Sequence, residues 1–202
     1  MYAGLVFILD YRGSLTMERK TFPELIVSPR LELRKHSLEL AETMYRYVDQ
    51  DRARLRIFLP WADAVNSVEV EANYIRMTHA NWEKGTLFDY GIFEKATGTY
   101  MGNVGVHNIA WAHDRCEFGY WILGKFEGKG FTSEAVEALE KVCFGLDFHR
   151  LEIRCSSHNP KSAAIPRKLG YALDGTLKED TIEQGAYRDT LVFGKLKKPG
   201  DK

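Results

Sequence analysis

Hydrophobic and polar positions recur along this 202-residue chain with two different periods. Residues 30–34 read Arg-Leu-Glu-Leu-Arg, with the period of two that is typical of a half-buried strand. Residues 38–48 and 68–82 carry their apolar side chains three or four positions apart, which predicts two amphipathic helices. Gly85 follows the second of these segments and is well placed to end that helix.

The rest of the chain predicts more strands than helices. Residues 54–63 contain Pro60 and follow neither period, so we expect an irregular connection there. The segment 95–98 ends in glycine and predicts a hairpin turn. Further strands are expected at 87–94, 100–109, 116–123, 149–155, 171–177 and 186–196, and further helices at 132–144 and 159–169. No repeat, low-complexity tract or linker is found, which predicts one α/β domain over residues 21–202.

Glycines at 128 and 130 stand between the strand at 116–123 and the helix at 132–144. Glycine permits a tight turn and leaves backbone N–H groups uncovered by a Cβ atom. Together with the N–H groups and the dipole at the start of the helix, the turn predicts a site for a pyrophosphate. Two other phosphate loops do not fit. A Walker loop requires Ser or Thr where Gly130 stands, and a dinucleotide fingerprint requires a third glycine where Ser133 stands.

The turn reads Glu127-x-x-Gly130-x-Thr132 and resembles the acetyl-coenzyme A loop of the GNAT acetyltransferases, [QR]-x-x-G-x-[GA], with departures at both outer positions. Other segments resemble, in order and spacing, the RimJ/RimL-type ribosomal-protein N-terminal acetyltransferases of that family. They are Leu59-Pro60-Trp61, Glu117-Phe118-Gly119-Tyr120-Trp121, Asn159-Pro160-Lys161-Ser162, Lys168-Leu169-Gly170-Tyr171 and Gly185-Ala186-Tyr187-Arg188-Asp189. The resemblance spans residues 27–196. It implies an α/β (α+β) GNAT fold, with a mixed, mostly antiparallel sheet that is splayed between its fourth and fifth strands and flanked by about four helices.

The resemblance also implies acetyl-coenzyme A as co-substrate, with its pantetheine arm in the splay. Strands that part leave backbone groups without partners, and pantetheine amides can pair with them as an added strand does. The expected cofactor-binding residues lie in the fourth strand, the glycine turn and the start of the last helix. They are Trp121, Ile122, Leu123, Glu127, Gly128, Lys129, Gly130, Phe131, Thr132, Asn159 and Ser162.

Transfer of an acetyl group from a thioester requires a proton for the departing thiolate. Asn159 is an N-cap residue type and Pro160 fits the first helical position, which places Ser162 in the first turn of a helix. The dipole there favours a developing thiolate. Many GNAT enzymes place a tyrosine proton donor seven residues after this asparagine, where this chain has Pro166. Ser162 is therefore the candidate general acid, and a helix-capping role is the alternative.

The acceptor amine must be neutral when it attacks, and two carboxylates are candidates for the general base. Glu117 lies on the strand expected to flank the cofactor, and Asp89 is a lone acid among the strand residues 87–93. For each, the alternative is a solvated or salt-bridged strand carboxylate. Cys155 either approaches the cofactor sulfur or is a buried structural cysteine. Trp61 either contacts the acceptor or belongs to the core.

Charge and composition restrict the partners. Lys plus Arg and Asp plus Glu both number 28, so charge supports neither a nucleic acid nor a membrane as a partner. Three scattered cysteines favour the reducing cytoplasm, and the six histidines form no metal motif, so no metal is expected. Residues 1–20 are predicted to be an N-terminal appendage, since their apolar run is too short to span a bilayer. An edge strand or a contact with another subunit is the alternative, and a homodimer is compatible with it.

These observations predict an acetyl-coenzyme A-dependent N-acetyltransferase. Its expected acceptor is a primary amine, the N-terminal α-amine of a protein of the ribosomal type. An α-amine has a pKa near 8 and a lysine amine one near 10.4, so the α-amine asks less of a general base. Two alternatives remain at this point: an acetyltransferase for a small amine such as a polyamine or an aminoglycoside, and a regulatory protein that binds acyl-coenzyme A without turnover.

Overall fold

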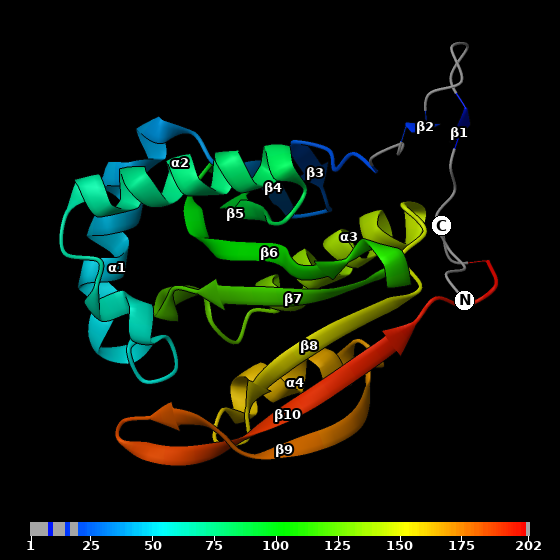
Figure 1. Cartoon of the computed structure of the whole chain (residues 1–202). Helices are drawn as coiled ribbons and strands as arrows, with labels where there is room; N and C mark the ends of the chain where they lie inside the picture. Colours follow the sequence, from blue (N-terminus) through cyan, green and yellow to red (C-terminus); the bar gives the residue numbers. More distant parts are fainter. Residues whose placement is uncertain (1–7, 10–14, 17–19, 201–202) are drawn as a thin grey trace.

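The computed structural model describes residues 8–9, 15–16 and 20–200 (Figure 1). Its strands are β1 Ile8–Leu9, β2 Leu15–Thr16, β3 Leu25–Val27, β4 Leu31–Lys35, β5 Phe88–Glu94, β6 Tyr100–Ala110, β7 Arg115–Ile122, β8 Arg150–Ser156, β9 Ala172–Glu183 and β10 Ala186–Leu196. Its α-helices are α1 Ala41–Leu55, α2 Val68–Lys84, α3 Phe131–Gly145 and α4 Pro160–Lys168. Short 3-10 turns lie at η1 Leu38–Leu40, η2 Pro60–Asp63, η3 Trp111–His113 and η4 Gly124–Phe126.

Eight of these strands form one sheet in the order β3-β4-β5-β6-β7-β8-β10-β9. Neighbouring strands are antiparallel except β7 and β8, which are parallel. The β7–β8 ladder holds four residue pairs and ends at Phe118 and Ile153, after which the strands diverge. The predicted GNAT fold is confirmed, with the splay between the fourth and fifth of the strands predicted from sequence.

Helices cover both faces of the sheet, α1 and α2 on one and α3 and α4 on the other (Figure 1). The main core joins the inner face of α3 to the apolar side chains of β4 to β8, among them the fully buried Leu139 and Ile153. A second, smaller cluster packs Met44 of α1 and Ile75 of α2 against Phe93 and Tyr100. The two helical layers therefore fix the central strands rigidly, as a site built on strands requires.

Several element boundaries differ from the prediction. Helix α1 runs on to Leu55, because Val48 and Leu55 are both buried against the η2 region. Strand β3 was not predicted, since Ile26 is its one buried residue and three residues show no period. Strand β9 continues past the predicted end at residue 177 to Glu183, because β10 supplies hydrogen-bond partners along that length. The side chains of β9 are largely exposed, so its sequence shows no alternation of apolar and polar residues that would predict the longer strand.

The predicted N-terminal appendage, residues 1–20, falls largely outside the described residues. Within it the structure describes the backbone of β1 and β2, which pair antiparallel. Among the described residues, no helix is long and apolar enough to cross a membrane. Over the same part of the chain, no group of three or more His, Cys, Asp and Glu side chains is arranged to hold a metal ion.

Candidate active site

The glycine turn that follows η4 has the conformation its sequence demands. Gly128 and Gly130 have φ angles of 73° and 80°, in the left-handed region that favours glycine. Gly130 is the N-cap of α3, so the first-turn N–H groups of that helix follow it directly. A Cβ on Gly130 would come within 3.6 Å of Arg30 Nη2 and 3.9 Å of Lys168 Nζ. Uncovered N–H groups and two cations thus surround one point, which suits a pyrophosphate.

Glu127, which departs from the usual Gln or Arg, is neutralised by two cations. Its Oε1 accepts a hydrogen bond from Arg54 Nη1 at 2.6 Å, and its Oε2 accepts one from Lys161 Nζ at 2.5 Å. Arg54 also donates to the carbonyl of Ile122 at 2.6 Å. The acidic residue therefore ties the last turn of α1 and the start of α4 to the turn, and Asp51 holds the other side of the Arg54 guanidinium, with its Oδ2 2.5 Å from Arg54 Nη2. The sequence predicted an irregular connection that begins at residue 54, but in the structure Arg54 belongs to helix α1.

The free backbone of β7 in the splay belongs to alternate residues. The N–H of Leu123 donates to Met101 O at 2.8 Å, which directs that residue toward β6. Since strand residues alternate in the neighbour they face, Tyr120 and Ile122 face the splay. The carbonyl of Leu123 is also used, by the N–H of Phe126 at 2.9 Å. Of the three strand residues predicted to bind the cofactor, Leu123 therefore offers it neither backbone group.

Helix α4 begins as the sequence predicts. The side chain of Asn159 accepts a hydrogen bond from the N–H of Ser162 at 3.0 Å, and Pro160 holds the first helical position. Pro166 lies within the helix and has no N–H to give to the carbonyl of Ser162. The phenol of Tyr120 takes that place, donating to Ser162 O at 3.0 Å. The proline thus fixes Tyr120 of β7 against the start of α4.

Tyr120 and Ser162 form a pair of adjacent hydroxyls beside the splay. Ser162 Oγ lies 3.4 Å from the Tyr120 oxygen, and burial raises the pKa of Tyr120, so the phenol stays protonated. Position 166 holds no tyrosine, yet β7 supplies a phenol to the same helix start. Half-buried Cys155 adjoins the pair: burial raises the pKa of its thiol, and a hydrogen bond with Ser162 opposes the rise.

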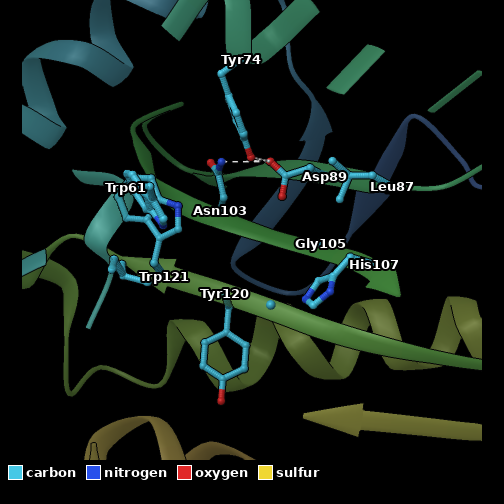
Figure 2. A pocket seen from close by; sticks show the side chains of 11 residues that line it. Trp61, Tyr74, Leu87, Asp89, Asn103, Gly105, His107, Tyr120 and Trp121 are labelled. Carbon is cyan, nitrogen blue, oxygen red and sulfur yellow. Dashed lines mark hydrogen bonds between the residues drawn. The ribbon is translucent and has the colours of Figure 1, made fainter. Parts of the chain in front are cut away.

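On the α1/α2 side of the splay lies a hollow of about 200 Å³ (Figure 2). Gly105 of β6 and Gly119 of β7 are directly paired and leave its floor bare. A Cβ on Gly105 would stand 2.6 Å from Asp89 Oδ1, and one on Gly119 would stand 3.0 Å from His107 Nε2. The lining residues are Leu59, Trp61, Tyr74, Leu87, Asp89, Asn103, Gly105, His107, Gly119, Tyr120 and Trp121. The hollow exists because two facing strand positions have no side chain.

Asp89 is the carboxylate of this hollow and is held by one of its two oxygens. Oδ2 accepts hydrogen bonds from Tyr74 OH at 2.7 Å and Asn103 Nδ2 at 3.0 Å (Figure 2). His36 Nε2 also lies 2.7 Å from Oδ2. Oδ1 lies over Gly105 in the hollow. These three groups, from α2, β6 and the loop after β4, thus hold Oδ2 and leave Oδ1 to face a ligand in the hollow. Nearby on α2, burial raises the pKa of Glu71 to about 7.

Glu117 lies beside the hollow but does not line it. Its Oε2 accepts a hydrogen bond from Asn108 Nδ2 at 2.9 Å and lies 3.5 Å from Arg154 Nε. Its Oε1 is 4.0 Å from Nε2 of His107, the residue that does reach the hollow. Trp61 stands on the wall of the hollow with its ring 5.5 Å from that of Trp121.

The structure brings together most of the residues that the sequence singled out, and adds two that it did not. The turn at 127–130, Ser162 and Cys155 adjoin the splay, whereas Asp89 lies two strands away across Gly105. Tyr120 and His107 were missed. Tyr120 sits within the Gly-Tyr-Trp segment. Because consecutive strand residues point to opposite faces of a sheet, its side chain could have been predicted to lie on the face opposite to that of Trp121. His107 carries none, because its place in the hollow depends on glycines of two strands.

Comparisons with known proteins agree with this geometry. A family model described as an acetyltransferase (GNAT) domain matches residues 30–172. The ribosomal-protein-serine acetyltransferase of Escherichia coli (strain K12) is 24% identical over 171 residues, 84% of this chain and 94% of that protein. The spermidine N(1)-acetyltransferase of Escherichia coli (strain K12) is 25% identical over 147 residues, 72% of this chain and 77% of that protein.

A solved structure agrees as well. RimL, a ribosomal α-N-protein acetyltransferase in complex with coenzyme A, gives a TM-score of 0.80 at 26% identity, covering 86% of this chain and 98% of that one. The family match, the splayed sheet and the glycine turn at the start of α3 agree with one another. This chain therefore belongs to the GNAT acetyltransferase family and is an acetyl-coenzyme A-dependent N-acetyltransferase.

Proposed function

We propose that this enzyme acetylates the N-terminal α-amine of a protein, in the manner of the ribosomal-protein acetyltransferases among its relatives. The observation that carries the proposal is the hollow over Gly105 and Gly119. Its volume of about 200 Å³ suits one small residue, and among the described residues that line it Asp89 is the one carboxylate. One carboxylate matches one ammonium group, whereas a polyamine presents several.

In this proposal acetyl-coenzyme A lies along the splay with its pyrophosphate at the start of α3. Residues 127–132 hold the phosphates through backbone N–H groups, with Arg30 and Lys168 nearby. Tyr120 and the N–H of Ile122 pair with the pantetheine amides from β7, since the carbonyl of Ile122 already accepts from Arg54. Trp121, Leu123 and Asn159 support that arrangement by packing and capping. The acetyl group then points toward the hollow, where the amine arrives from the α1/α2 side and attacks directly in a ternary complex.

The proposed catalytic groups lie on the two sides of β7. Ser162, with Tyr120, gives a proton to the departing thiolate at the start of α4, where the helix dipole favours the thiolate. Asp89 receives the ammonium group of the acceptor, and Glu117 supports its deprotonation from beside the hollow. We place this reaction in the cytoplasm. A homodimer is compatible with it.

The test is release of free thiol from acetyl-coenzyme A with a panel of acceptors. We expect turnover with short peptides that begin with serine or alanine and none with the same peptides already acetylated at the N-terminus. Faster turnover with spermidine than with every peptide would reject the α-amine acceptor. Absence of thiol release with all amines, despite acetyl-coenzyme A binding by calorimetry, would instead indicate a regulatory binding protein.

A further inference from the structure

We propose that His107 is the group that takes the proton from the acceptor amine, with Glu117 behind it as a positioning residue. This inference rests on the proposed function and concerns the same hollow. His107 lies in β6, opposite Glu117 of β7 in the antiparallel ladder. It is part of the lining of the hollow, and its side chain is about one-third exposed.

The position of the imidazole carries the proposal. A Cβ on Gly119 would be 3.0 Å from His107 Nε2, so the ring occupies space that any side chain at 119 would take. The ladder between β7 and β8 ends at Phe118, one residue earlier. His107 therefore holds a basic nitrogen where β7 becomes free to meet the thioester. Histidine is the side chain whose ordinary pKa permits proton uptake near neutral pH.

The two carboxylates nearby are less well placed for this task. Asp89 lies over Gly105, which is one strand farther from the splay than Gly119. Glu117 is occupied by Asn108 and by Arg154, and it does not line the hollow, whereas His107 does. Its Oε1 is 4.0 Å from His107 Nε2, close enough to stabilise an imidazolium by charge.

The proposed step conserves every proton. The acceptor ammonium gives one proton to His107 Nε2, and the freed lone pair forms the C–N bond to the acetyl carbon. The C–S bond breaks, and the thiolate takes a proton from the Ser162–Tyr120 hydroxyl pair. The second proton of the amine restores that pair, and the imidazolium releases its proton to water. The products are the acetamide, coenzyme A as the free thiol and one proton.

The test compares His107→Gln with His113→Gln, which changes an exposed histidine in η3. We expect His107→Gln to lower kcat by about 10²–10⁴-fold, the usual effect of losing general acid–base catalysis, with an unchanged KM for acetyl-coenzyme A. His113→Gln should match the wild type. A thermal melt of each variant shows whether it is folded, and His107→Ala with added imidazole serves as a second variant, in which imidazole should restore part of the rate.

A second acceptor separates proton removal from packing. A peptide whose terminal amine is weakly basic, and so is already neutral at the assay pH, should lose much less rate in His107→Gln than an ordinary peptide does. Equal losses for both acceptors, or an unchanged rate in folded His107→Gln, would overturn the assignment. Spermidine is assayed in parallel, because turnover of spermidine alone rejects the α-amine acceptor while the His107 comparison still holds for whichever amine reacts.

Discussion

The glycine turn at the start of α3 and the hollow over β5 to β7 both depend on glycine, but in different ways. In the turn, Gly130 supplies a backbone conformation, with φ of 80° and N–H groups that follow in sequence. In the hollow, Gly105 and Gly119 have ordinary strand pairing, and their lack of side chains leaves the space above them open. The first kind of glycine acts within a short segment. The second acts only after distant strands have paired.

The surroundings differ in the same way. Charged groups near the turn are part-exposed and paired, as Arg54 and Lys161 are with Glu127. Polar groups behind the hollow are buried and connected, as Asp89 is with Tyr74 and Asn103. Buried networks cost more to disturb than exposed ion pairs. The turn should therefore tolerate changes of charge, and the hollow should not.

The largest expected effect lies between the two regions, at the hydroxyl pair. Ser162→Ala and Tyr120→Phe should each lower kcat by about 10²–10⁴-fold, because the pair supplies the proton for the thiolate. Since the two hydroxyls act as a unit, the double variant should be no slower than the slower single variant. Steady-state kinetics at saturating acetyl-coenzyme A, with a melt of each variant, measures this. A lower melting temperature with kcat preserved would assign Ser162 to helix capping alone.

The next effect concerns stability behind the hollow. Burial raises the pKa of Glu71 to about 7, so the folded protein binds this proton more tightly than the unfolded chain does. The stabilisation that this bound proton gives the folded protein is complete below the ordinary glutamate pKa. It is lost as the pH rises through about 7, the raised pKa of Glu71. Relative to Glu71→Gln, the wild type should lose about 3 kcal/mol of unfolding free energy from pH 4 to 8. Urea unfolding measures it, with the exposed Glu69→Gln on the same helix as control.

A pair of glycine substitutions separates the regions directly. Gly130→Val should raise the KM for acetyl-coenzyme A at least about tenfold, because a branched side chain covers the N–H groups. Gly185→Val is its control, since Gly185 also has positive φ, 77°, but adjoins no site. Gly105→Ala should instead lower kcat/KM for the acceptor and leave cofactor binding intact, because its Cβ meets Asp89. Calorimetry with acetyl-coenzyme A distinguishes them, and reversed effects would contradict the comparison.

The smallest effect is expected at Glu127. Glu127→Gln frees positive charge on Lys161 for the phosphates, while Arg54 stays paired with Asp51, and an ion pair with an exposed partner such as Lys161 contributes about 0–1 kcal/mol. The KM for acetyl-coenzyme A should therefore fall by no more than about threefold and should depend more steeply on salt. Glu137→Gln removes an equivalent surface carboxylate of α3 and should change nothing. A large rise in KM would show that Glu127 contacts the cofactor directly.

The comparison also explains what the sequence could predict. The turn and the N-cap at Asn159 could be predicted, because each is encoded by residues a few positions apart. The splay between the fourth and fifth strands came instead from the family resemblance, and the place of β10 between β8 and β9 was not predicted. The effect of Pro166 on the carbonyl of Ser162 could be predicted too, but its new partner Tyr120, 42 residues away, could not. The role proposed for His107 could not be predicted either, because it depends on the strand register that places Gly105 opposite Gly119. The strand predicted to end at residue 177 was too short, because the exposed side chains of β9 show no alternation of apolar and polar residues.

The four-pair ladder between β7 and β8 has a consequence for the opening motions of the protein. In the described part of the chain, this ladder joins the half of the sheet that holds strands β3 to β7 to the half that holds β8, β9 and β10. It has four residue pairs, whereas the neighbouring ladder between β8 and β10 has seven. Local opening follows the weakest cooperative boundary, so amide hydrogens at this seam should exchange with solvent sooner than those between β8 and β10. A pantetheine arm bound across the splay bridges both halves and stabilises the closed form by mass action. Coenzyme A should thus protect from exchange backbone amides on both sides of the seam, including residues that it never touches.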